Sequence, residues 1–160
     1  MPSPDRSERR TVVICIGNQN VADAAVGYEV FSRLEPTTAR LEYCGMGVAD
    51  LLPLLNGETE LIVVDAVQLG AAPGTVHVLP WQAIPKIGDQ LAPHGLGLRE
   101  TIEIGRFLCP EQVPQRVMLV GVEGRCFDQG RDRMTAEVAE AIDAAVVIVQ
   151  ELVQGKRAFP

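Results

Sequence analysis

This sequence of 160 residues lacks several features that would place it in other classes of protein. No uninterrupted apolar stretch approaches the length of about 20 residues that spans a bilayer, so no membrane-spanning helix is expected. Positive charge is scarce, because 14 lysines and arginines stand against 21 acidic residues, a formal net charge of −7. That balance argues against nucleic acids and anionic membranes as partners. Internal repeats, low-complexity segments and linkers are also missing, which predicts one domain.

The four cysteines show no metal-binding or redox spacing. No two of them form a CxxC pair, and Cys15 and Cys44 fall in or at the end of apolar runs. Free cysteine is among the most buried residue types, so we expect reduced, mostly buried thiols, as in a cytoplasmic protein. Residues 1–10 are polar and carry no apolar core, which predicts a flexible N-terminal arm and not a secretory signal.

What the sequence does contain is an alternation of apolar strands and amphipathic helices. The apolar runs predict strands at residues 11–16, 39–44, 60–67, 75–79 and 116–122, and helical spacing predicts helices at 24–34, 50–55, 96–108 and 134–154. Residues 75–79 alternate like an edge strand, and residues 80–95 are predicted to form a long loop. The pattern predicts a three-layer α/β/α sandwich with a mostly parallel sheet of about five strands, in one domain at residues 11–155.

Ligands of such a sheet gather beyond the carboxyl ends of its strands, and polar residues fall there. Asp65 ends a buried strand, where an ionised carboxylate costs several kcal/mol unless it is paired, hydrogen-bonded or metal-bound. This pattern favours a ligand or a catalytic acid, and the alternative is a cap on a neighbouring helix N-terminus. Asp23 follows the first strand. Glu123 follows another strand and either reaches the same cleft or is simply solvated.

His94 stands between Pro93 and Gly95 in the long loop. The proline restricts the backbone and the glycine lets it pass close to another group, so His94 is a candidate metal ligand or general base. The alternative is a histidine that caps the following helix. His77 alternates within the predicted edge strand and is expected at the surface.

Four segments carry a family resemblance in their order and spacing. They are Gly17 and Asn18 through Asp23 to Gly27, then Ile62-Val63-Val64-Asp65-Ala66, then Pro93-His94-Gly95-Leu96-Gly97-Leu98, and last Leu119-Val120-Gly121-Val122-Glu123. In these segments the chain resembles the nickel–iron hydrogenase maturation endopeptidases, which remove a C-terminal extension from the hydrogenase large subunit. The resemblance implies that the substrate is a hydrogenase large-subunit precursor loaded with nickel.

The resemblance also implies a set of site residues. The family holds a divalent metal, thought to be the nickel of the substrate, on an acid at the start of the first helix, an aspartate that ends a strand and a histidine in a later loop. The last two correspond to Asp65 and His94, which would be the catalytic residues. The first falls on Ala24. Asp23 matches the acid before that ligand, although neighbouring helical residues point about 100° apart.

A second departure from the family concerns the loop that lines the substrate cleft. The family has an acidic loop with glycine and threonine there, whereas this chain has Tyr43-Cys44-Gly45-Met46-Gly47. The resemblance therefore implies that Gly45 and Gly47 contact substrate, with Glu123 as a further candidate.

Two functions stay open at this stage. In one, the chain is a working endopeptidase in which Asp23 joins Asp65 and His94 around a metal that anchors the precursor, polarises the scissile carbonyl or lowers the pKa of a bound water. In the other, it is a non-proteolytic relative that binds a hydrogenase subunit or another partner, because Ala24 removes one ligand. A chance match of an unrelated α/β domain is the third reading.

Overall fold

The computed structural model describes residues 10–45, 47–86, 97–128 and 133–158. In this part of the chain a five-stranded sheet has the strand order β2-β1-β3-β5-β4. The strands are β1 (Thr11–Ile16), β2 (Arg40–Cys44), β3 (Glu60–Val67), β4 (Val76–Pro80) and β5 (Arg116–Glu123). β1 pairs in parallel with β2 and β3, β3 pairs in parallel with β5, and β4 lies antiparallel to β5 at the edge. The mostly parallel sheet and its edge strand are as predicted.

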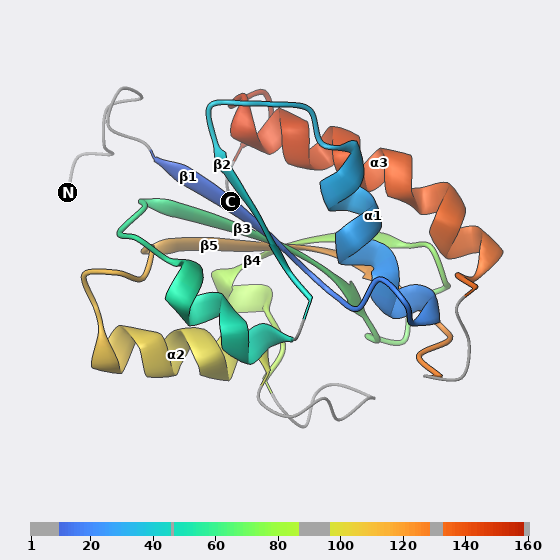
Figure 1. Ribbon diagram of the computed structural model, residues 1–160, viewed down its shortest axis with the longest axis horizontal. Helices are drawn as coiled ribbons and strands as arrows, with labels where there is room; N and C mark the ends of the chain where they lie inside the picture. Colours follow the sequence, from blue (N-terminus) through green and yellow to red (C-terminus); the bar gives the residue numbers. More distant parts are fainter. Residues whose placement is uncertain (1–9, 46, 87–96, 129–132, 159–160) are drawn as a thin grey trace.

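Helices cover both faces of this sheet, which confirms the three layers. α1 (Val26–Arg33) and α3 (Ala136–Val153) pack on one face, and α2 (Leu98–Leu108) lies on the other face with the 3₁₀ helix η3 (Val48–Leu54) (Figure 1). The short 3₁₀ helices η2 (Ala22–Ala25) and η4 (Trp81–Ala83) lead out of β1 and β4. None of the helices in the described part of the chain is long and apolar enough to cross a membrane.

The central strands are apolar on both sides because both sides are covered. In β1, Val13 and Cys15 join the core beneath α1 and α3, whereas Val12 and Ile14 join the core beneath η3 and α2. All four side chains are fully buried. The continuous apolar runs of β1, β3 and β5 therefore predict their positions in the middle of the sheet.

The first helix differs from its prediction in how it begins. The chain enters it through the 3₁₀ turn η2, and the α-helix starts only at Val26. The Asp23 N–H donates outside the helix, to the Cys126 carbonyl oxygen at 3.0 Å. A Cβ atom at Gly27 would lie 2.0 Å from the Ile16 carbonyl oxygen, so α1 rests directly on the end of β1.

The structure describes only Arg10 of the predicted N-terminal arm, so the flexibility of that arm stays a prediction. Residues 1–9 lie outside the described residues, but Arg10 is held, because its N–H donates to the Thr59 Oγ1 at 3.0 Å and its guanidinium donates to the Gly57 carbonyl oxygen at 2.8 Å. The four cysteines are free thiols, as expected. Cys15 and Cys44 are buried, whereas Cys126 is partly exposed and Cys109 is exposed.

Candidate functional site

Asp65 lies at the carboxyl end of β3, where the buried part of the strand stops. Five buried residues precede it, and it points to the α2 face of the sheet because it shares the strand alternation of Val63. Its carboxylate accepts a hydrogen bond from the Ala66 N–H at 2.8 Å, which is its only partner among the described residues. Burial raises the pKa of Asp65 to about 7, against the smaller opposing effect of this bond. The carboxyl group therefore titrates near neutral pH.

On the neighbouring strand β1, the thiol of Cys15 is buried in the core on the α1 and α3 face and is unsuited to a role in chemistry. Burial, and secondarily the charge of Asp65, raises the pKa of Cys15 to about 12. Nucleophilic attack and metal binding both need the thiolate, so at neutral pH Cys15 acts as a core residue.

Position 24, where the family resemblance places an acid, carries the methyl group of Ala24 in η2. The neighbouring Asp23 is fully buried, and its carboxylate is turned to the connection between β5 and α3. One oxygen accepts hydrogen bonds from the Arg125 and Cys126 N–H groups, each at 2.8 Å, and from the Thr135 hydroxyl at 2.7 Å. The other accepts from the Thr135 N–H at 2.7 Å. These contacts give Asp23 a structural role, and its service as a metal ligand stays a prediction.

The pKa of Asp23 reflects the same contacts. Burial alone would raise it, but the backbone and hydroxyl donors of Cys126, Arg125 and Thr135 outweigh burial and hold the pKa below its usual value. An ionised carboxylate that accepts several hydrogen bonds is stabilised in this way. Sequence reasoning missed Thr135 as its partner, because a threonine directly before a helix predicts a side-chain cap, whereas this hydroxyl makes no cap bond and donates to Asp23.

Glu123 is also buried, with 1% of its surface exposed, and it organises the connection between β3 and β4. Its carboxylate accepts from the Leu69 N–H at 2.8 and 3.0 Å and from the Ala71 N–H at 2.7 Å. Of the two alternatives that the sequence left open for Glu123, simple solvation is therefore wrong. In this arrangement Glu123 shapes the loop beside the carboxyl edge, and direct contact with substrate stays a prediction.

His77 is not the surface residue that its alternation predicted. Its side chain is partly buried, and its Nε2 atom lies 3.6 Å from a carboxylate oxygen of Glu123. Gly121 of β5 pairs in register with both Asp65 of β3 and His77 of β4, so these two residues flank a position without a side chain. Glu123 of the neighbouring strand lies beside the His77 ring, and alternation along one strand does not reveal such a neighbour.

The loop after β2 differs in chemistry from an acidic cleft wall. The Tyr43 hydroxyl, near the end of β2, donates to the Gly17 carbonyl oxygen at 2.5 Å, which ties the end of β2 to the loop that follows β1. Gly47 has a φ of +114°, a conformation that favours glycine, and a Cβ atom there would meet no other atom within 4 Å. Gly45 instead packs against the Tyr43 ring, where a Cβ atom would lie 3.1 Å from the hydroxyl oxygen. Substrate contact by either glycine stays a prediction.

His94 lies outside the described residues, but the chain on both sides of its loop is well anchored. A guanidinium nitrogen of Arg99 donates to the Trp81 carbonyl oxygen at 3.2 Å and to the Ile84 carbonyl oxygen at 3.1 Å. The Trp81 ring packs against the guanidinium groups of Arg99 and Arg106, with 4.9 and 4.3 Å from ring centroid to guanidinium carbon. Within residues 10–45, 47–86, 97–128 and 133–158, no three histidine, cysteine, aspartate or glutamate side chains gather closely enough to hold a metal ion.

The fold is that of an open α/β protein, a class in which ligands bind beyond the carboxyl ends of the parallel strands, where Asp65 lies. Comparison with known proteins identifies the family. The family model for hydrogenase maturation protease matches residues 34–152, and the chain belongs to that family. Members of the family are endopeptidases of hydrogenase maturation.

Individual relatives agree with this assignment. The chain is 27% identical over 144 residues to the hydrogenase expression/formation protein HupD of Rhizobium leguminosarum bv. viciae, covering 86% of this chain and 70% of the relative. It is 28% identical over 157 residues to HupD of Rhodobacter capsulatus, covering 93% and 74%. Among solved structures it matches the hydrogenase maturating endopeptidase HybD from E. coli with a TM-score of 0.76 and 25% identity, covering 92% of this chain and 93% of that one.

Proposed function

We propose that this chain removes the C-terminal extension of a nickel-loaded hydrogenase large-subunit precursor, with Asp65 and His94 recognising the metal that the precursor carries. Membership of the hydrogenase maturation protease family supports the reaction. The four free thiols fit a reducing, cytoplasmic location, which we propose with it.

The observation that carries the proposal is that the Asp65 carboxylate has few partners among the described residues and a raised pKa. Asp65 is partly exposed, but the desolvation of its carboxyl group raises its pKa, and a desolvated carboxylate needs a compensating charge or several hydrogen bonds. Asp65 has one hydrogen-bond donor and no ion pair with any described residue. A divalent cation presented at this edge would supply the missing charge, and both carboxylate and imidazole are ligands that nickel accepts. Such a cation polarises a carbonyl or activates water when bound, while Asp65 and His94 would fix its position.

The test is to incubate the purified chain with nickel-loaded precursor and follow the loss of the extension by mass spectrometry. We expect cleavage by the native chain and loss of cleavage in Asp65→Asn and in His94→Ala. Asp50→Asn changes an exposed carboxylate in η3 and is the matched control, so it should cleave normally. Cleavage at the native rate by Asp65→Asn and His94→Ala would contradict the assigned roles.

Ala24 favours a second candidate function, in which the chain binds a hydrogenase subunit without cleaving it. The ligand set lacks one carboxylate, and the oxygens of Asp23 are engaged by Arg125, Cys126 and Thr135. If this function holds, the native chain binds the precursor and leaves it intact, and Ala24→Glu restores cleavage. Calorimetry with nickel and cadmium on the native chain, Asp65→Ala, His94→Ala and Ala24→Glu tests whether the native ligands suffice for the metal.

A further inference from the structure

Helix α2 carries a second apolar stripe on the side that faces away from the sheet. It buries Leu98, Thr101, Ile102 and Gly105 in the fold. On its outer side Ile104 is 40% exposed, Phe107 86% and Leu108 66%. Their spacing of three and four residues makes them neighbours on the helix surface. A helix packed on a sheet needs only the inner stripe, so the outer one indicates a contact with another molecule.

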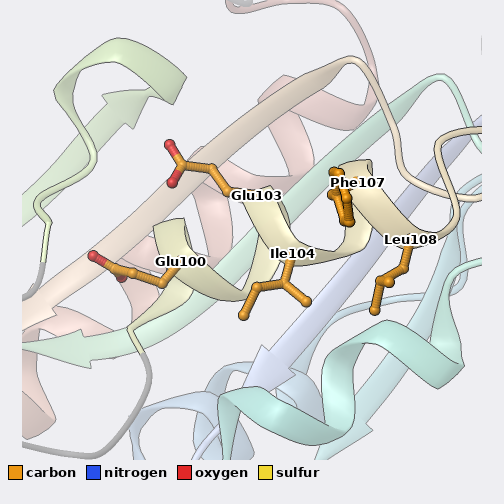
Figure 2. A pocket seen from close by; sticks show the side chains of 5 residues that line it. All are labelled: Glu100, Glu103, Ile104, Phe107 and Leu108. Atoms are coloured by element: carbon orange, nitrogen blue, oxygen red, sulfur yellow. The ribbon is translucent and has the colours of Figure 1, made fainter.

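Acidic side chains continue this stripe toward the N-terminal half of the helix. Glu100 and Glu103 line a shallow pocket together with Ile104, Phe107 and Leu108, and we call these five residues the α2 patch (Figure 2). Glu103 is 54% exposed, although it lies 3.5 Å from Arg99. Of the basic residues of the helix, Arg106 stacks on Trp81, whereas Arg99 both stacks on Trp81 and pairs with Glu103. The α2 patch is therefore acidic at one end and apolar at the other.

Charge and size argue against a second copy of this chain as the occupant. Two copies would each bring a net charge of −7 and would repel each other. The surface of three apolar side chains is also far smaller than the roughly 800 Å² that each partner buries in a stable interface. The α2 patch fits one part of a larger contact, made with a partner that is held at another point as well.

The position of α2 indicates where that other point lies. The helix begins at Leu98, directly after the part of the chain that contains His94. Eleven residues make it about 16 Å long, and Leu98 is only four residues after His94 in the sequence, so chain connectivity alone keeps the α2 patch within reach of a protein surface that meets His94. We propose that the α2 patch docks the hydrogenase large-subunit precursor through an apolar surface bordered by lysine or arginine. This inference rests on the proposed function and names a second contact for the same substrate.

The test measures binding of purified, nickel-loaded precursor to the native chain and to variants by biolayer interferometry. Phe107→Ser removes the most exposed apolar group, and Glu103→Lys reverses one charge. We expect each to raise the Kd about tenfold, the size of effect typical of an interface anchor. Val147→Ser is the matched control, because Val147 is the other large hydrophobic side chain of the described residues that is exposed, at 50%, and it lies on α3. Its Kd should stay within about twofold of the native value.

Three results would overturn the inference. Native Kd values in Phe107→Ser and Glu103→Lys, with cleavage or binding of the precursor intact, would reject the α2 patch and leave the proposed function standing. A native chain that neither binds nor cleaves the precursor would remove both proposals together. A dimer that Phe107→Ser abolishes while precursor binding is unchanged would assign the α2 patch to a second copy. Equal thermal unfolding midpoints of all variants establish that the comparison concerns binding and not folding.

Discussion

Asp65 combines burial with a single hydrogen bond, and this couples the stability of the fold to pH. Because the folded chain holds the Asp65 proton up to a pKa of about 7, against 3.8 in the unfolded chain, the folded state binds more protons between these values. The contribution of Asp65 to the unfolding free energy therefore falls as the pH rises through that window. Above it, the ionised carboxylate destabilises the fold when no cation is bound.

Asp65→Asn should remove this pH dependence. We expect its stability advantage over the native chain to grow by roughly 2 kcal/mol between pH 5 and pH 8, measured by urea denaturation at both values. Asp50→Asn, at an exposed position, should show the native pH dependence. Parallel pH profiles for Asp65→Asn and the native chain would show that Asp65 is not the coupled group.

Asp23 changes the pH dependence of the unfolding free energy in the opposite direction, because its pKa is lowered in the folded chain. Its contribution is complete above the unfolded pKa of 3.8 and is lost as the pH falls through the lower folded value. In Asp23→Asn an amide NH₂ group faces N–H donors, and buried donors are left without an acceptor. We therefore expect the free energy of unfolding to fall by about 3 kcal/mol at pH 7, and by less below pH 4.

Urea denaturation measures this loss, and hydrogen exchange at the Arg125, Cys126 and Thr135 amides reports its location. The exposed Asp143→Asn is the control, and it should change stability by less than about 0.5 kcal/mol. If Asp23→Asn is as stable as the native chain, the carboxylate does not hold the β5–α3 connection. That result would favour a role of Asp23 as a metal ligand over a structural role.

At the scale of elements, Glu123 couples β5 to the β3–β4 loop and so to the edge strand. Its carboxylate holds Leu69 and Ala71, and the backbone of the same residue exchanges hydrogen bonds of 2.8 Å with Gly74 and Thr75. Side chain and main chain together fix the loop that passes beside the Asp65 edge.

Glu123→Gln replaces one acceptor oxygen by an NH₂ group, and we expect faster hydrogen exchange at residues 68–80 and a loss of about 1–2 kcal/mol. Exchange in α3, on the other face, should stay at the native rate. Glu140→Gln changes an exposed acid of α3 and should alter neither quantity. Unchanged protection of residues 68–80 in Glu123→Gln would assign the loop conformation to the main-chain bonds alone.

At the scale of the whole molecule, the strands and layers could be predicted because apolar periodicity depends on local sequence. The run at residues 60–67 became β3 without change, and Asp65 fell at the rim of the sheet as its position after four apolar residues indicated. Boundaries shifted where distant contacts decide them. The start of α1 moved to Val26 because Asp23 bonds to Cys126, more than 100 residues away, and no local pattern reports such a partner.

The candidate site could be predicted only in outline for the same reason. Strand ends place polar groups at one edge, but the partners of Asp23 and Glu123 come from loops with no periodic signal. His77 likewise lies 3.6 Å from Glu123 of the neighbouring strand, a proximity that alternation along one strand does not report. The departure at Ala24, in contrast, is visible in the sequence itself and carries directly into the proposed function.

The strand order has a consequence for how the chain reaches its folded state. β5 lies between β3 and β4, although it follows both in the sequence, so a place for it must stay open until residues 116–123 have been synthesised. Until then β3 lacks a neighbour on one side, and exposed strand edges favour association with other chains. A fragment of residues 1–115 should therefore lack the cooperative unfolding transition of the full chain in circular dichroism. Completion of the last strand and helix is the step at which a nascent chain becomes a folded protein.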